Sequence, residues 1–415
     1  MITRPKKILG NPMKEEKQMK KLIVLIGSIC MVMGMVGFTE AKDKIVFGQA
    51  IGITGPIASA VGFLEVPITK LWLEEVNKKG GIYVPEEGKR LPVELLRYDD
   101  KGDIPTTLKL FEKLATVDKV DIILPPHGTA WHLAVAPLAA KYKYPLVTFT
   151  FMTERYREVA HKYGYTFITT TASRESQAAF LDLMVELGVK KAAVVYVSSE
   201  FGIENAQFLA PIMVPAGIES VMLKSYPMNP KDLSPLLKEA KVANVDAFIA
   251  FSYVPDTMLL PEQAKMVDFN PKLFYVALAC AWPAFKAKFG PATEGVMGPG
   301  GWNEKYSPKA KEFYDKFLAM HGRPPCNWST AFGYGTYQIY EQAIEKVGLK
   351  DREKLRDVIA TSTFDTVYGP IKYTDYFNVD HPSYIGQWQK GTFESVAPKA
   401  TRKVSPIYPK PAWPK

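Results

Sequence analysis

The chain has 415 residues, of which 47% are hydrophobic and 23% are charged. This composition excludes a disordered chain and a protein with many membrane spans, and the length leaves room for two domains. The formal net charge is +9, but residues 1–41 hold seven basic and three acidic residues, so the remaining chain carries +5. Because this mild excess contains no basic run, the sequence argues against nucleic-acid binding.

The N-terminal residues 1–41 have the pattern of a cleavable signal peptide. Basic residues in MKEEKQMKK precede an uncharged apolar run at 22–38. Thr39 and Ala41 then supply the two small residues expected before cleavage at Lys42. The pattern predicts export to the periplasm or another extracytoplasmic space. A retained anchor helix is the alternative, because the apolar run is only slightly shorter than a membrane span.

Strands and helices are predicted to alternate from residue 44 onward. Strands are expected at 44–51, 91–100, 120–126, 144–151, 191–199, 245–253 and 271–279. Helices are expected at 66–81, 104–118, 129–143, 202–216, 231–242 and 257–267. Near-continuous apolar strands between helices are typical of parallel sheets covered on both faces. The sequence therefore predicts an α/β fold with two doubly wound lobes whose strand-end loops face each other across a central ligand cleft.

The Gly-rich segment GITGPIASAVG, residues 52–62, joins the first strand to the first helix. It has no lysine for a Walker loop, no G-x-G-x-x-G spacing and no G-x-S-x-G elbow. Pro56 suits the first turn of a helix, where its missing N–H costs nothing. The segment therefore predicts a tight turn at the lip of a pocket, with no chemistry of its own.

Two cysteines, Cys280 and Cys326, follow the predicted signal peptide. An exported protein can form a disulfide, but the sequence does not show that the two residues approach each other. Two buried thiols are the favoured interpretation.

The five histidines are His127, His132, His161, His321 and His381. Their spacing matches no common metal site, and no Ser, Cys, His and Asp pattern suggests a nucleophilic triad. The sequence therefore predicts no catalytic residue, no metal site and no cofactor, and an enzyme is disfavoured.

Five motifs occur in this order: GQAIGITGPIASAVG, NKKGGI, LLRYDDKGDIPTTLKLFEKL, VYVSSEFGIENAQ and FDTVYGPIKYTD. Together they cover about residues 44–400 and resemble periplasmic solute-binding proteins of the leucine/isoleucine/valine-binding class. The resemblance implies a type I periplasmic binding fold, with two lobes joined by three crossover strands. It implies residues 44–164 plus 293–365 for lobe 1, and residues 165–292 plus 366–415 for lobe 2.

The resemblance further implies the substrate-binding component of an ABC importer. Such a protein is expected to be a monomer that closes over a small carboxylate-bearing molecule and presents it to a membrane permease. A ligand-binding sensory module that feeds a membrane receptor is the alternative. The chain ends in the Pro-rich stretch SPIYPKPAWPK, whereas a receptor is expected to continue into a membrane span and an output domain.

Candidate ligand contacts in lobe 1 begin in LPPHGTAWHL. Thr129 can cap the helix that follows, and the amides of Ala130 and Trp131 would join its hydroxyl in holding a carboxylate. The resemblance places a hydroxyl residue here against the ligand carboxylate. The alternative is that Thr129 is only a helix cap.

Further candidates come from three other loops. In TFTFMT, Thr150 keeps the hydroxyl of the second ligand-contacting segment and Phe151 adds a large ring; core packing is an equal alternative. SSEFG places Phe201, and FSYVPD places Tyr253, where the resembled family commonly offers an aromatic ring. Each ring could close over an apolar or flat ligand.

The segment ALACAWPAF departs from the resembled family. Amino-acid binders of that family usually present an acidic residue here to hold the ligand ammonium, but this segment contains none and Trp282 is its prominent side chain. Glu200 or Asp256 could substitute from neighbouring loops, and Phe332 could reach the cleft, although core packing suits it better. We therefore rank aromatic or aliphatic carboxylates without an ammonium above branched-chain amino acids.

Overall fold

The computed structural model describes Met1 and residues 42–414, with residues 380 and 382 omitted. The predicted signal peptide thus lies outside the described residues, apart from Met1. Residues 44–415 form one compact unit. In the part of the chain that is described, no helix has the length and apolar character needed to span a bilayer.

The first sheet has three parallel strands in the order β4-β1-β5. They are β1 (Ile45–Ile51), β4 (Val93–Asp99) and β5 (Ile122–Leu124). Three two-stranded sheets accompany it: β2 (Ile82–Val84) with β3 (Lys89–Leu91), β6 (Leu146–Thr148) with β7 (Thr166–Ile168), and β13 (Thr363–Thr366) with β14 (Gly369–Lys372). The surrounding helices are α2 (Ala58–Phe63), α3 (Glu65–Lys78), η1 (Pro85–Glu87), α4 (Ile104–Thr116), α5 (Thr129–Tyr142), α6 (Arg155–Tyr163), α12 (Pro308–His321), α13 (Ser329–Val347) and α14 (Arg352–Thr361).

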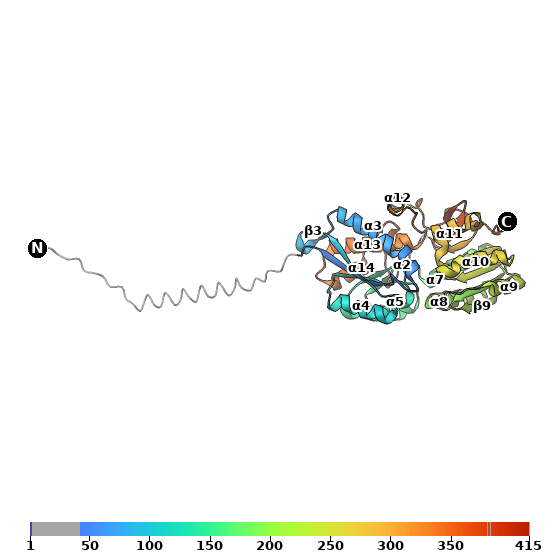
Figure 1. The fold of residues 1–415 in the computed structure, drawn as a ribbon, viewed down its shortest axis with the longest axis horizontal. Coiled ribbons are helices and arrows are strands. Elements are labelled where there is room, and N and C mark those ends of the chain that lie inside the picture. Colours follow the sequence, from blue (N-terminus) through green and yellow to red (C-terminus); the bar gives the residue numbers. More distant parts are fainter. Residues whose placement is uncertain (2–41, 380, 382, 415) are drawn as a thin grey trace. The chain divides into compact units, whose positions relative to one another are not determined.

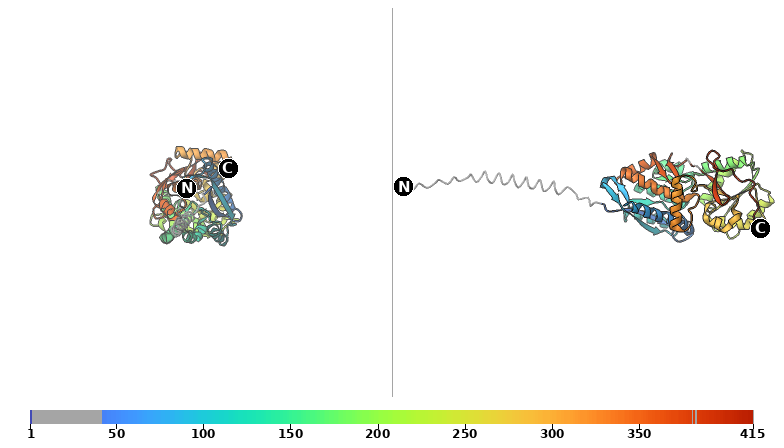
Figure 2. Two further views of the ribbon diagram at one scale, coloured as in Figure 1. Left: turned by 90° about the vertical axis from the view of Figure 1, so that its left-hand side faces the viewer. Right: turned by 90° about the horizontal axis from the view of Figure 1, so that it is seen from above.

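The central strand β1 is buried on both faces, as a parallel strand between two helical layers must be. Phe47 packs in one cluster with residues of α3 and α13, whereas Ala50 packs in another cluster with residues of α4 and α5. Trp72 of α3 lies edge-on to Phe47 at 5.0 Å and stacks on Tyr337 of α13 at 4.6 Å. Figures 1 and 2 show these early and late segments side by side.

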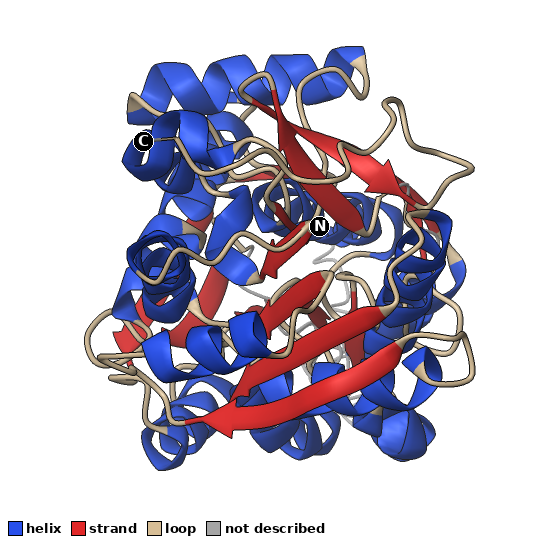
Figure 3. Ribbon diagram, turned by 90° about the vertical axis from the view of Figure 1, so that its right-hand side faces the viewer, coloured by secondary structure: helices blue, strands red, loops and turns tan. Residues whose placement is uncertain are grey.

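The second sheet has seven strands in the order β16-β15-β12-β11-β10-β8-β9. The strands are β8 (Lys191–Val197), β9 (Glu219–Tyr226), β10 (Ala247–Phe251), β11 (Leu273–Val276), β12 (Met297–Pro299), β15 (Ile385–Gln389) and β16 (Thr392–Ala397). Figure 3 shows helices lying beside strands of the sheets. The helices in this part of the chain are α7 (Ser173–Glu186), α8 (Glu200–Met213), α9 (Ser234–Val242), α10 (Val254–Met266), η2 (Leu278–Ala281), α11 (Pro283–Phe289) and η3 (Gly290–Thr293). The β9–β12 part is parallel as predicted, but β15 and β16 add antiparallel pairs, so the sheet is mixed.

The alternation of strands and helices follows the prediction along the chain, with shifted helix starts. α8 and α10 begin at Glu200 and Val254, earlier than expected. The Ser199 side chain caps α8, and the Asp256 carboxylate accepts a hydrogen bond from the Tyr253 amide at 2.9 Å. These polar caps allow each helix to begin fewer residues after the end of the preceding strand.

Three strands pair across the residues at which the sequence analysis divided the two lobes. β12 lies beyond residue 293, yet it pairs with β11 and β15. β7 lies beyond residue 165, yet it pairs with β6, and β14 lies beyond residue 365, yet it pairs with β13. A short strand joins the sheet of the strand to which it hydrogen-bonds, and the spacing of motifs in the sequence does not reveal that pairing. The division into two lobes at those residues stays a prediction.

Both Cys280 and Cys326 are buried free thiols, as the sequence analysis favoured. The Sγ of Cys280 lies 3.4 Å from the Met297 carbonyl oxygen. The Thr330 hydroxyl donates to the Sγ of Cys326 at 3.1 Å. Each thiol therefore has its own local contacts in the core.

The Gly-rich turn after β1 is fixed by Asp99 at the end of β4. The Asp99 carboxylate accepts hydrogen bonds from the Thr54 hydroxyl at 2.6 Å and the Thr54 amide at 3.1 Å. These bonds lower the pKa of Asp99, with the hydroxyl as the largest cause. Pro56 directly precedes the N-cap Ile57 of α2, so it stands near the helix start but just outside the first turn.

Gly55 in this turn and Gly62 in the following helix α2 offer a matched pair of substitutions. Gly55 has φ +87°, and an added Cβ would lie 2.1 Å from the Lys101 carbonyl oxygen, whereas a Cβ at Gly62 meets nothing within 4 Å. We expect Gly55→Ala to lower the free energy of unfolding by about 1–3 kcal/mol. Gly62→Ala should leave it unchanged or raise it by about 0.5–1 kcal/mol, because helical Ala loses less backbone entropy. Urea unfolding measures both; equal effects would contradict this account of the turn.

Candidate functional site

The candidate site is a cavity, called here the inner cavity, with about 560 Å³ of empty space that is partly open to solvent. Most of its wall follows directly after parallel strands of both sheets. The wall residues are Ala60, Leu64, His127, Gly128, Thr129, Phe149, Thr150, Met152, Thr170, Phe201, Tyr253, Val254, Leu278, Trp282, Trp328 and Ser329.

Five of the predicted ligand contacts line this inner cavity. They are Thr129, Thr150, Phe201, Tyr253 and Trp282. The structure therefore brings together residues from the loops after β5, β6, β8, β10 and β11. Their contact with a ligand stays a prediction.

Thr129 does not cap α5, which corrects the expectation from the sequence. Gly128 is the N-cap, with φ +95°, and Thr129 is the first helical residue. The Thr129 hydroxyl instead lies 3.3 Å from the carbonyl oxygen and 3.4 Å from the amide of Met152. The Gly128 amide donates to the Thr150 hydroxyl at 3.2 Å. These bonds join the loops after β5 and β6, and they place both hydroxyls at one wall.

Ala130 and Trp131 line a second cavity, called here the outer cavity, which shares His127, Gly128 and Tyr253 with the inner one. No acceptor within the described residues binds the amides of Thr129, Ala130 or Trp131. Free amides in the first turn of a helix favour an anion. These amides lie near the junction of the two cavities, and their contact with a carboxylate stays a prediction.

Phe151 lines neither cavity, so the structure does not support its place among the site residues. Its ring is fully buried, stacks on His132 at 4.9 Å and lies against Tyr156. Phe149 and Met152, its neighbours, line the inner cavity instead. The core-packing alternative thus describes Phe151 correctly.

His132 is a structural residue next to the site. Its Nδ1 lies 2.7 Å from the Gly128 carbonyl oxygen, and burial lowers the pKa of the ring to about 3. The ring therefore stays neutral at ordinary pH.

Aromatic rings from several loops line much of the inner cavity. Trp282 stacks on Phe63 with ring centres 3.9 Å apart and planes within 9° of parallel. The Arg323 guanidinium lies 3.9 Å from the Phe63 ring and donates to the Phe63 carbonyl oxygen at 2.7 Å. Phe201 and Tyr253 stack at 5.7 Å. This wall offers flat apolar surface to a ligand.

The two acids considered as ammonium partners lie outside the inner cavity. Asp256 is buried, and it accepts hydrogen bonds from the Tyr226 hydroxyl at 2.6 Å and the Tyr253 amide at 2.9 Å. Burial raises the pKa of Asp256. Glu200 lines the outer cavity and pairs with Arg155 at 2.7 Å. The described residues that line the inner cavity include no Asp, Glu, Lys or Arg.

Sequence reasoning missed several wall residues. His127 is adjacent to Gly128 and binds the Glu65 carboxylate at 2.5 Å, but the two residues are 62 positions apart, so the sequence does not reveal this pair. Trp328 and Ser329 stand at the start of α13 rather than after a strand, so no strand-end signal marks them. Phe332, in the same helix, is buried with its ring 3.9 Å from that of Tyr368. Core packing was the favoured interpretation of Phe332.

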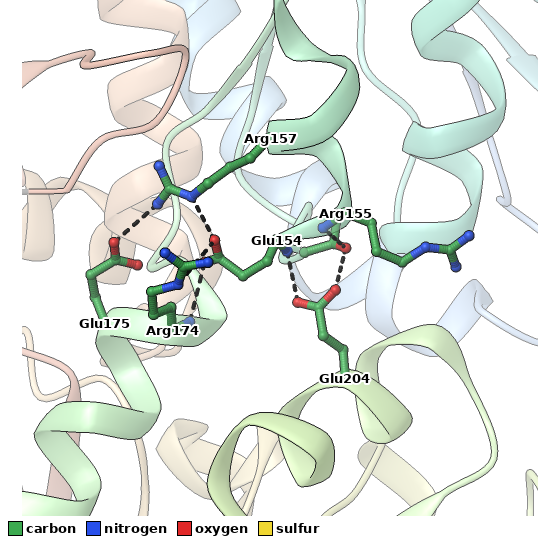
Figure 4. A network of polar contacts seen from close by, with 7 residues as sticks. Glu154, Arg155, Arg157, Arg174, Glu175 and Glu204 are labelled. Carbon is green, nitrogen blue, oxygen red and sulfur yellow. Dashed lines mark hydrogen bonds and ion pairs between the residues drawn. The ribbon is translucent and has the colours of Figure 1, made fainter. Parts of the chain in front are cut away.

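A buried polar contact ties α8 to the start of α6 near the cavity. The Glu204 carboxylate accepts hydrogen bonds from the Thr153 hydroxyl and, at 2.8 Å, from the Glu154 amide. Figure 4 shows Glu204 directed from its helix toward this segment. Glu154 in turn pairs with Arg157 at 2.5 Å and accepts from the Arg174 amide at 3.1 Å. Burial raises the pKa of Glu204, although its hydrogen bonds oppose the shift.

Substitutions of Glu204 separate its hydrogen bonds from its charge. Glu204→Ala leaves the Thr153 hydroxyl and the Glu154 amide unpaired, and we expect it to cost about 1–3 kcal/mol of unfolding free energy. Glu204→Gln keeps hydrogen-bonding atoms without the buried charge, so stability at pH 7 should match or exceed that of the wild type.

The pH dependence has a definite sign. Because the folded pKa of Glu204 is raised, its contribution to stability is fully present at low pH and is lost as the pH rises through that value. Glu204→Gln should lack this loss. Urea unfolding across acidic and neutral pH measures the difference; a Gln variant as unstable as the Ala variant would contradict the account.

The chain resembles known proteins over most of its length. The profile of the family described as "Periplasmic binding protein" matches residues 44–392. The leucine-, isoleucine-, valine-, threonine- and alanine-binding protein of Pseudomonas aeruginosa is 24% identical over 365 residues, which cover 86% of this chain and 94% of the relative.

Solved structures show the same fold. The branched-chain amino acid transporter substrate-binding protein LivJ from Streptococcus pneumoniae, in complex with isoleucine, has a TM-score of 0.74 at 20% identity and covers 86% of this chain and 100% of its own. An ABC transporter solute-binding protein from R. palustris, in complex with benzoate, has a TM-score of 0.73 at 18% identity and covers 87% and 100%. In the described residues, no group of three or more His, Cys, Asp or Glu could hold a metal ion.

Proposed function

Because this chain belongs to the periplasmic binding protein family, we propose that it is the extracytoplasmic substrate-binding component of an ABC importer. Its ligand is a small aromatic or aliphatic carboxylate without an ammonium group. The predicted signal peptide at 1–41 would export it, and a membrane permease would receive the loaded monomer. Binding and release, rather than bond-making, are its mechanism.

The composition of the inner cavity wall carries the ligand assignment. The inner cavity is lined by the hydroxyls of Thr129 and Thr150 and by aromatic rings such as that of Trp282. The free helix amides lie next to Thr129. A buried ammonium without a carboxylate partner costs several kcal/mol, and the wall holds no acid. The complex of a structural relative with benzoate supports this chemistry in the same fold.

A branched-chain amino acid is the second candidate ligand. The Pseudomonas aeruginosa relative is a leucine-, isoleucine-, valine-, threonine- and alanine-binding protein, and LivJ is in complex with isoleucine. Glu200 lines the outer cavity and could meet an ammonium there, although it already pairs with Arg155. The amino group would then have to reach past the junction of the two cavities. A sensory module, the other class considered, has no specific contact in its favour.

Closure of the cleft would trap the ligand. Trp282 follows β11 of the seven-stranded sheet, and Phe63 lies between β1 and β4 of the three-stranded sheet. The Glu204 contact with Thr153 likewise joins α8, beside the seven-stranded sheet, to the segment after β6 of the β6–β7 sheet. We expect these contacts to form when the cleft closes and to separate when it opens.

A thermal-shift screen tests the ligand class. The probes are benzoate, 4-methylpentanoate, leucine and isoleucine, applied to residues 42–415. A ligand at 100 times its dissociation constant stabilises a folded protein by about 2.7 kcal/mol, which raises the melting temperature. We expect a response to the two acids that lack an ammonium. A response to leucine and isoleucine alone would assign the second candidate, and silence with all four would contradict both.

Thr129→Val and Phe151→Leu test the site assignment. Thr129→Val removes a hydroxyl from the wall of the inner cavity, and we expect it to weaken carboxylate binding about tenfold. Phe151→Leu alters a buried ring outside both cavities, so it should lower stability and leave affinity unchanged. Isothermal titration and urea unfolding separate the two effects. The reverse pattern would place the ligand elsewhere.

A further inference from the structure

A buried carboxylate stands behind the wall of the inner cavity. Glu65, the first residue of α3, is 1% exposed, and its Oε1 lies 2.5 Å from Nδ1 of His127. Its other oxygen, Oε2, has no hydrogen-bond partner among the described residues. An ionised carboxylate in such a place is costly unless a cation or a strong donor accompanies it. His127 supplies its direct partner.

His127 faces the ligand space from the other side of this pair. It lines both the inner and the outer cavity, and its side chain is 13% exposed. Because Nδ1 of His127 is hydrogen-bonded to Glu65, the remaining polar atom of the ring is Nε2. No residue of the described chain hydrogen-bonds to Nε2. A ring anchored at one nitrogen presents its other nitrogen in a fixed direction.

Other charged groups near the pair do not replace it. Arg97 of β4 donates to Gln49 at 2.9 Å and to Thr69 at 3.0 Å rather than to Glu65. His132 stays neutral because burial lowers its pKa to about 3. Glu200, on the outer cavity, is paired with Arg155. His127 is therefore the group on the inner wall that can carry a positive charge toward the ligand.

We propose that His127 is bound to Glu65 as an imidazolium and donates its Nε2–H to the carboxylate of the ligand. This inference rests on the proposed function and deepens it, because it names the group that selects an anionic acid over its neutral amide. The Thr129 hydroxyl and the helix amides would bind beside it. A charge-assisted bond is about twice as strong as a neutral one.

Binding of the anion is then coupled to the proton on His127. Affinity for the anion is highest where His127 is protonated and falls where it is neutral. Removing the negative charge of Glu65 withdraws support for the imidazolium. Glu65→Gln should therefore weaken binding of the acid, because the imidazolium loses its ion-pair partner.

The experiment measures dissociation constants by isothermal titration between about pH 5.5 and about pH 8, the range in which histidine titrates. The probes are benzoate and 4-methylpentanoate with their neutral amides, and leucine with leucinamide. We expect the wild type to prefer acid over amide at least tenfold and to lose affinity for the acid as the pH rises. His127→Gln should remove the pH dependence and most of the preference. Glu65→Gln should weaken binding of the acid.

His321→Gln is the matched control. The Nε2 of His321 lies 3.1 Å from the Pro67 carbonyl oxygen of α3, and His321 lines neither cavity. This variant should keep the wild-type affinity and pH profile. It shows that the loss of a histidine beside α3 is not sufficient to change binding.

The outcomes separate the two proposals. If the wild type binds an acid with the same affinity at every pH, or if His127→Gln keeps the preference for acid over amide, the role of His127 is wrong and the proposed function stands. If the wild type binds none of the three acids, both proposals fail. Should a variant fail to fold, the pH profile of the wild type still decides.

Discussion

The site depends on one constraint, namely that parallel strands deliver their following loops to the same edge of a sheet. The loops after β5, β6 and β7 bring His127, Thr150 and Thr170 to the inner cavity, and the loops after β10 and β11 bring Tyr253 and Trp282. Both sheets turn their carboxyl ends toward one space, which is where open α/β sheets bind ligands. The strands themselves are buried and uniform, so the differences that define a ligand reside in these loops.

Much of this arrangement could be predicted from the sequence, because strand ends are visible as apolar runs followed by small or capping residues. Thr129, Tyr253 and Trp282 were found in this way. The direction in which a loop side chain points could not be predicted. Phe151 is directed into the core because the chain is irregular once β6 ends at Thr148, and period-two alternation no longer applies. Contacts that join distant segments also left no local signal, as with Glu65 and His127.

The residue at which a helix begins could not be predicted reliably from the sequence, for a related reason. Thr129 has the side chain of an N-cap, but Gly128 takes that position because its φ of +95° suits glycine. The hydroxyl of Thr129 is thereby freed from its own helix and reaches the backbone of Met152. A residue that looked like a cap thus becomes a link between two loops of the wall. Propensity alone does not distinguish these roles, because both use the same hydroxyl.

In the closure proposed above, the Trp282–Phe63 stack and the Glu204 contact would act in opposite directions. The stack of Trp282 on Phe63 removes apolar rings from water and favours the closed arrangement. The Glu204 carboxylate is buried in that arrangement, and burial disfavours its ionised form even though Thr153 and Glu154 donate to it. Opening would return the rings to water at a cost and would return the carboxylate to water at a gain. A balance of this kind leaves closure sensitive to a ligand, since a ligand shifts the equilibrium by its differential affinity for the two arrangements.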